Sequence, residues 1–130
     1  MLEKFRVQTK ARNVMVDVTA EVQKAIDRSG VKSGIACIFT PHTTAAVTIN
    51  EHDDPDVARD IAATLEKVIP QKGDYRHYEG NSDSHIKSTL AGCSQTVIIE
   101  DGRLQLGTWQ GVFFCEFDGP RQREVWVKIV

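Results

Sequence analysis

Cysteine pairs, long apolar runs and a signal segment are all missing from this sequence. Its three cysteines form no C-x-x-C motif, and an odd number cannot be fully bridged within one chain. The longest apolar runs, at residues 97–99 and 112–115, are far too short to cross a bilayer. Residues 1–6 lack the apolar segment of a signal peptide. We therefore expect a cytoplasmic protein with no membrane partner, with Cys37 and Cys115 packed in the core and Cys93 exposed.

An excess of charge of one sign is missing too. The net charge is −2, and acids and bases are interspersed without a basic block or stripe. Nucleic-acid binding therefore has no electrostatic support. The chain also has no internal repeat or linker. With 130 residues and 41% hydrophobic content, we expect one compact domain over residues 1–130.

The pattern of strands and helices is typical of the α+β class. Residues 3–9, 14–18, 34–40 and 45–50 have strand patterns, and Pro41 predicts a bend or bulge between the last two. Asp101-Gly102 predicts a hairpin between residues 96–100 and 103–106. We expect a second strand pair, residues 108–118 with 123–130, across Gly119-Pro120-Arg121. Helices inserted among strands that we expect to be antiparallel favour an α+β fold.

Three helices are expected. Thr19 is a candidate cap for the first, which Gly30 would end. Asp54 suits the N-cap of the second, with Pro55 at its first position and an apolar stripe that continues to Pro70. The third is short, at about residues 84–91, with Ile86 and Leu90 four apart and Gly92 at its end.

Three of the four histidines lie in small polar settings of the kind that form sites, namely His42, His77 and His85. A catalytic zinc site needs three protein ligands and one open position, and imidazoles can supply those ligands. Their spacing matches no compact zinc motif, so three surface or hydrogen-bonded histidines remain the alternative. His52 lies among acids before the second helix, and we interpret it as a solvated loop residue.

Glu51, Asp53 and Asp54 could supply a general base or orient an imidazole. Negative charge is also favourable at a helix N-terminus, and Asp54 is better explained as a cap. Glu51 has no such structural duty in the sequence, so it is the candidate base.

Several polar residues could contact a substrate. Thr108 and Gln110 belong to Gly107-Thr108-Trp109-Gln110-Gly111, where two glycines allow a backbone to approach a ligand closely, although the segment could equally be a tight strand entry with a buried indole. Arg121 could hold a phosphate or a carboxylate, or pair with Glu116 or Asp118. Asn81 could bind a ligand or cap the third helix. Thr43, beside His42, is a further candidate.

Three motifs in order resemble the signatures of the YjbQ-like family. Residues 41–51 (PHTTAAVTINE) followed by 54–57 (DPDV) resemble the first signature. Residues 80–87 (GNSDSHIK) are similar to the second, and residues 106–121 (LGTWQGVFFCEFDGPR) to the third. The likeness spans nearly the whole chain.

The resemblance implies a small α+β fold built on a β-sandwich and assembled as a homotrimer. It also implies a site near a subunit boundary in which His42, His77 and His85 bind a divalent metal, with zinc preferred and magnesium a second choice. Members are often labelled secondary thiamine-phosphate synthases.

Two hypotheses follow for the function. The first is a metal-dependent enzyme for a small substrate, with phosphate as the candidate recognised group and Glu51 as base or orienting acid. Its substrate contacts would come from Thr43, Asn81, Thr108, Gln110 and Arg121. Coupling the two thiamine precursors releases diphosphate, which Mg²⁺ on carboxylates usually holds, whereas three imidazoles suit zinc. That coupling could therefore be a side activity of a site made for another substrate. The second hypothesis is a non-catalytic trimer that binds a metal or a phosphorylated metabolite.

Overall fold

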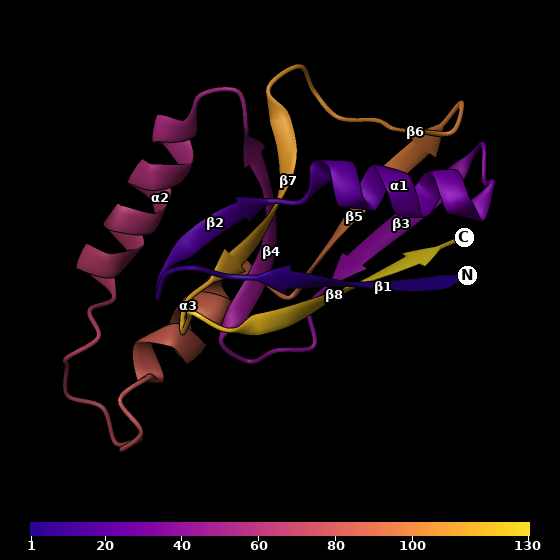
Figure 1. Cartoon of the computed structure of the whole chain (residues 1–130). Coiled ribbons are helices and arrows are strands. Elements are labelled where there is room, and N and C mark those ends of the chain that lie inside the picture. The colour runs from indigo at the N-terminus through magenta and orange to yellow at the C-terminus, as the bar shows by residue number, and fades with distance from the viewer.

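Two antiparallel sheets share one core in the computed structural model, which describes all residues 1–130 (Figure 1). The larger sheet has the strand order β1-β8-β3-β5-β6, and the smaller one has the order β2-β7-β4. In chain order the elements are β1 (Leu2–Gln8), β2 (Val14–Asp17), α1 (Thr19–Ser29), β3 (Gly34–Phe39), β4 (Ala45–Glu51), α2 (Pro55–Val68), α3 (Ser82–Ala91), β5 (Ser94–Glu100), β6 (Arg103–Leu104), β7 (Gln110–Glu116) and β8 (Gln122–Ile129). The expected α+β class with two sheets and three helices is confirmed.

The core lies between the sheets and under α1. Alternate residues of β8, namely Val125, Val127 and Ile129, are buried, as a strand with one covered face requires. Val47 and Phe114 contribute from the smaller sheet to the same apolar cluster. The apolar stripe of α1 closes this cluster with its buried residues Val22, Ala25 and Ile26.

The two strand pairs expected in the C-terminal third have different outcomes. The hairpin between β5 and β6 is confirmed, and Asp101 and Gly102 have positive φ angles of 52° and 72°. The expected pair of β7 with β8 is wrong, because β7 pairs with β2 and β4 while β8 pairs with β1 and β3. The turn at Gly119-Pro120, which has a cis peptide bond, carries the chain from one sheet to the other.

The starts of α1 and α2 differ from each other in how well the sequence predicts them. Asp54 accepts a hydrogen bond from the Asp56 N–H at 2.9 Å, which confirms it as the cap of α2. The predicted cap of α1 is wrong, because Thr19 lies inside the helix and Asp17 accepts hydrogen bonds from its N–H and its hydroxyl. The Thr19 hydroxyl is held there because its oxygen accepts from the Val112 N–H of β7.

Helix α3 buries its polar side. Asp83, Ser84, Lys87 and Ser88 are buried, whereas Ile86 and Leu90, the pair that indicates the helix in the sequence, are exposed. The helix is present as expected, and its covered side is the opposite of the one that an apolar pair favours. This orientation follows from ion pairs beneath the helix, described below.

The three cysteines differ in burial. Cys115 is buried and Cys93 is exposed as expected, while Cys37 is only partly buried. Burial raises the pKa of the Cys115 thiol to about 12, so it stays protonated. None of the three helices is long and apolar enough to cross a membrane.

Candidate functional site

His42 lies in the bend between β3 and β4, where Pro41 interrupts the strand pattern. Its Nε2 accepts a hydrogen bond from the Glu124 N–H of β8 at 2.9 Å. Burial, and after it the positive charge of Arg123, hold the pKa of His42 below its usual value. The ring is therefore neutral at pH 7, with Nε2 as the acceptor and the proton on Nδ1.

His77 and His85 meet edge to face. His77 comes from the loop before α3 and His85 from the first turns of α3, and their ring centroids are 5.5 Å apart. Two imidazoles on one tetrahedral zinc have centroids about 5 Å apart, given zinc–nitrogen distances of about 2.0–2.1 Å. The Glu79 carboxylate lies 3.7 Å from Nε2 of His77, beyond direct hydrogen-bond distance.

A cleft of about 570 Å³ contains both His42 and His85. It lies between the 40–43 bend and α3, and four of its ten lining residues carry hydroxyl groups. The lining residues include Thr43, Ser88, Thr89 and the exposed Cys93. Since His85 also contacts His77, the structure brings the three predicted histidines to one end of the molecule.

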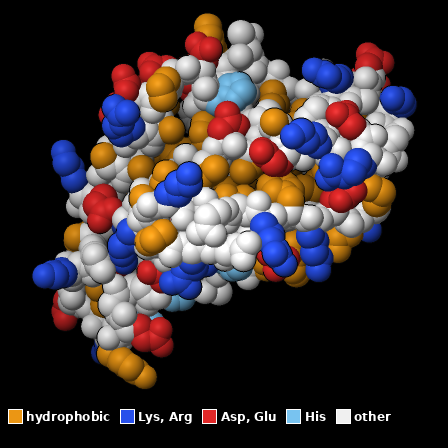
Figure 2. Space-filling view, viewed as in Figure 1, with side chains coloured by type: hydrophobic (Ala, Val, Ile, Leu, Met, Phe, Trp, Pro, Cys, Tyr) orange, Lys and Arg blue, Asp and Glu red, His pale blue; other side chains and the backbone are white.

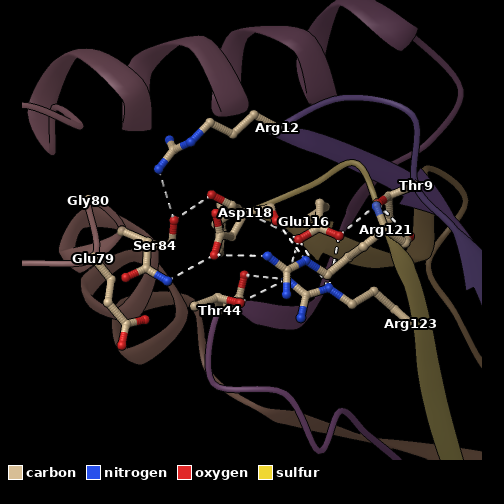
Figure 3. A network of polar contacts seen from close by, with 12 residues as sticks. Thr9, Arg12, Thr44, Glu79, Gly80, Ser84, Glu116, Asp118, Arg121 and Arg123 are labelled. Atoms are coloured by element: carbon tan, nitrogen blue, oxygen red, sulfur yellow. Dashed lines mark hydrogen bonds and ion pairs between the residues drawn. The ribbon is translucent and has the colours of Figure 1, made fainter.

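A buried ion pair supports the bend that carries His42 (Figure 3). Arg123 donates from Nε to Glu116 at 2.9 Å and from Nη2 to the Thr44 hydroxyl at 2.8 Å. The side chains of Arg123 and Glu116 are 3% and 0% exposed. Water therefore cannot replace either member of the pair if the other is removed. Burial alone would raise the pKa of Glu116, but hydrogen bonds from Arg123 and Thr9 outweigh burial and lower it.

Asp118 joins two of the predicted substrate contacts. Its Oδ2 accepts from the Asn81 amide at 2.9 Å and from Nη2 of Arg121 at 3.2 Å. Arg121 therefore forms the ion pair that its sequence neighbours indicate, yet half of its side chain is exposed and can meet a ligand. The Oδ1 of Asn81 is buried and has no hydrogen-bond partner, and Asn81 makes no side-chain cap to α3.

Glu51, Thr108 and Gln110 lie at the other end of the smaller sheet. Glu51 pairs with Gln110 across β4 and β7, whereas Ala45 at the histidine end of β4 pairs with Glu116. Six residue steps of strand separate the two ends by about 20 Å. Within one chain, these three residues are therefore not brought together with the histidines.

At that far end the expectation for Glu51 needs correction, and the one for His52 holds with an addition. Glu51 does have a structural duty, because its Oε2 accepts from the Asp54 N–H at 3.1 Å just before α2. His52 is exposed but held in place, because its Nδ1 lies 2.9 Å from Asp17 Oδ2. Its ring also packs on Gly111 so closely that a Cβ atom added at Gly111 would lie 2.4 Å from the ring. The indole of Trp109 is 58% exposed, so the buried alternative does not hold.

Sequence reasoning overlooked Arg12, Glu116 and Arg123 as parts of this region. Arg123 had a readable signal, because it falls on the same side of β8 as Val125 and Val127 and a charge there must be paired. Arg12 had none, because its partner Asp83 is 71 positions away.

The residue types fit a zinc site, and the arrangement fits it in part. His77 and His85 have the separation that a shared metal requires, whereas the Nε2 lone pair of His42 is occupied by the Glu124 N–H. In the present arrangement, no three His, Cys, Asp or Glu side chains surround a point that could hold a metal ion. A third imidazole would bind only after the His42 ring turned away from Glu124.

Comparison with known proteins identifies the family of the whole chain. The family described as UPF0047 protein YjbQ-like matches residues 3–130. The chain belongs to this YjbQ-like family. It is 56% identical over 130 residues to a UPF0047 protein of Methanocaldococcus jannaschii, covering 100% of this chain and 94% of that one. It is 48% identical over 131 residues to the UPF0047 protein YugU of Bacillus subtilis, covering 100% and 99%.

Solved structures of YjbQ-like proteins share the fold. A protein of this family from Clostridium acetobutylicum superposes with a TM-score of 0.97 at 55% identity, covering 98% of this chain and 99% of that chain. A protein from Aeropyrum pernix described as hypothetical has a TM-score of 0.96 at 34% identity, covering 100% and 98%. The YjbQ-like fold is therefore kept across widely diverged sequences.

Proposed function

We propose that this YjbQ-like protein is a cytoplasmic, metal-dependent enzyme for a small phosphorylated substrate, and that its site is formed by His42, His77 and His85. One observation carries the proposal. Three histidines from separate segments lie at one end of the molecule, two of them 5.5 Å apart and two in one cleft of about 570 Å³. Mere surface histidines have no reason to gather in this way.

The charges beside the histidines favour an anionic substrate. Arg121 is half exposed and is held by Asp118. Its guanidinium is therefore already ordered and can bind a phosphate without a further loss of side-chain entropy. The neutral ring of His42 presents an N–H donor at Nδ1, and Thr43 adds an exposed hydroxyl at the cleft. Thr43 can contact the substrate at the cleft, while Asn81 supports Arg121 through the Asp118 carboxylate that they share.

A bound zinc ion would supply Lewis acidity or a water of lowered pKa to this site. The chain's own candidate for orienting His77 is Glu79, because Glu51 lies about 20 Å from the histidines at a strand rise of about 3.3 Å per residue. Glu51, Thr108 and Gln110 can serve the site only from a neighbouring subunit. We retain the homotrimer as part of the proposal, with a solution mass of three times the 14.5 kDa chain expected by light scattering.

Alanine variants of the three histidines test the proposal. The wild-type protein should bind one zinc ion per chain after dialysis and titration, and His42→Ala, His77→Ala and His85→Ala should each lower that affinity by at least about 10-fold. His52→Ala is the matched control, because it removes a histidine at the far end. Coupling of the pyrimidine and thiazole precursors of thiamine phosphate is the activity to assay first.

A non-catalytic binding protein is the second candidate. It is favoured by the absence of a carboxylate base among the residues that line the histidine cleft. This candidate predicts stoichiometric binding of metal or phosphate with no turnover on any substrate panel. The first proposal fails if neither zinc content nor any activity changes in the three histidine variants.

A further inference from the structure

Arg12 is attached to the helix that carries His85. It lies in the connection between β1 and β2, and its two terminal nitrogens each donate to one oxygen of Asp83, both at 3.0 Å. One of these nitrogens also lies 3.3 Å from the Ser84 hydroxyl. Such a two-point contact between a guanidinium and a carboxylate fixes direction as well as distance. The first turn of α3 is thereby oriented from outside the helix.

The backbone of Arg12 holds a second part of the site. Its carbonyl oxygen accepts a hydrogen bond from the Gly119 N–H at 3.1 Å. Gly119 belongs to the turn with Asp118 and Arg121, and Asp118 in turn binds Asn81. One residue therefore connects α3 to the 118–121 turn, and Figure 3 shows Arg12 near Ser84 and Asp118 of these two segments.

Charge neutralisation alone does not explain Arg12. Lys87 is fully buried and already contacts Asp83, with its Nζ 2.8 Å from Oδ2. Asp83 thus keeps an opposite charge when Arg12 is removed. Arg12 adds the second bonded oxygen and the contact with Ser84, both of which restrict how α3 can rotate.

We propose that Arg12 is a positioning residue of the site: its guanidinium sets the rotation of α3 so that His85 faces His77 and the cleft with His42. The functional importance of this inference rests on the proposed function, since both concern the same histidines. Its geometric content, the placement of His85 against His77, can be measured without any metal or substrate.

The test uses Arg12→Ala and Arg12→Lys, with Arg59→Ala as the matched control. Arg59 is an exposed arginine on α2 that pairs with Asp56, so its loss removes a surface ion pair away from α3. In the metal-free protein, nuclear Overhauser contacts between the rings of His77 and His85 should be present in the wild type and in Arg59→Ala. They should be lost in Arg12→Ala and weakened in Arg12→Lys, which keeps the charge but not the two-point contact.

Chemical rescue separates positioning from folding. Ethylguanidinium added to Arg12→Ala should restore the ring contacts, whereas ethylammonium at the same concentration should not. Zinc affinity should fall about 10-fold in Arg12→Ala and recover with ethylguanidinium, in line with the loss on removing outer supports of metal ligands. If Arg12→Ala does not fold by circular dichroism, Arg12→Lys carries the same comparison.

The outcomes distinguish this inference from the proposed function. Unchanged ring contacts in Arg12→Ala and Arg12→Lys, or equal rescue by both cations, would overturn the positioning role. A wild-type protein that binds no zinc but shows the predicted pattern of ring contacts would sink the metal-dependent function and leave the role of Arg12 standing.

Discussion

Helices α2 and α3 both lie against β4, and they are attached in opposite ways. Helix α2 has the apolar stripe that its sequence predicts, yet none of its residues is fully buried. A hollow of about 760 Å³ is lined by residues of both α2 and β2, with Met15, Ala62 and Phe113 in its walls. Figure 2 shows hydrophobic side chains at the surface beside α2. Helix α3 instead buries Asp83, Ser84, Lys87 and Ser88.

The difference shows how a short helix can be held in a defined rotation. Apolar contacts are non-directional, so a stripe like that of α2 tolerates small rotations. The ion pairs and hydroxyl contacts of α3 have fixed geometry, and they leave the outer side of the helix to His85 and Thr89 at the cleft. Burying charge is costly, so we interpret this arrangement as serving position more than stability.

The largest expected effect comes from breaking the charge cluster under α3. Asp83→Ala leaves Lys87 fully buried without its principal counter-charge, since its contact with Glu66 is 3.9 Å. The free energy of unfolding should fall by about 3–5 kcal/mol, the range for an orphaned buried charge. Urea denaturation measures this value. Adding Lys87→Met should recover part of the loss, and a double variant as unstable as Asp83→Ala would contradict the account.

The pH dependence of stability should come from the same buried carboxylates. Burial raises the pKa of Asp83, but hydrogen bonds from Arg12 and Lys87 outweigh it, and the pKa ends below its usual value. A carboxyl group with a lowered folded-state pKa stabilises the protein above its unfolded-state pKa of about 3.9. That contribution is lost as the pH falls through the folded-state value.

The free energy of unfolding should therefore decrease from about pH 5 downward, because unfolded chains take up protons first. Urea titrations at several pH values measure the slope, and Asp83→Asn and Glu116→Gln should each flatten it. A slope that both variants share with the wild type would show that other groups govern acid unfolding.

The smallest effect is expected on α2. Leu65 is only partly buried and packs on a three-residue cluster, so Leu65→Ala should cost about 1 kcal/mol in free energy of unfolding. The matched variant Ile26→Ala removes a fully buried side chain from α1 and should cost about 2–5 kcal/mol. Thermal or urea unfolding compares the two. An equal cost at both positions would mean that α2 is covered in solution, as the expected trimer could do.

Local signals explain which parts of the fold could be predicted. The cap of α2 joins Asp54 to an N–H two residues away, and Asp101-Gly102 is a local signal for the β5–β6 turn, to which Gln23 and Lys32 add hydrogen bonds from a distance. The partners of β7 and β8 are distant in sequence, so adjacency along the chain suggested a pair that the sheets do not contain. The polar side of α3 is covered by partners distant in sequence, such as Arg12 for Asp83 and Ala45 for Ser88, and no local pattern can reveal them.

The candidate site divides in the same way. The residue types make the histidines candidates, the likeness to the YjbQ-like family implies that they share a site, and the structure gathers His42, His77 and His85 at one end. The role of Arg12 exists only through a pair 71 positions away, whereas Arg123 has a readable signal as a charge on the buried side of β8. Glu51 is a candidate base in the sequence because the sequence does not show its bond to the Asp54 N–H.

The coordination shell of bound zinc tests the central claim most directly, that the three histidines form one metal site. X-ray absorption on protein loaded with one equivalent of zinc should show three imidazole nitrogens at about 2.0–2.1 Å. The shell should fall to two imidazoles in His42→Ala. A shell of water oxygens, or one that is the same in His42→Ala and the wild type, would contradict the account.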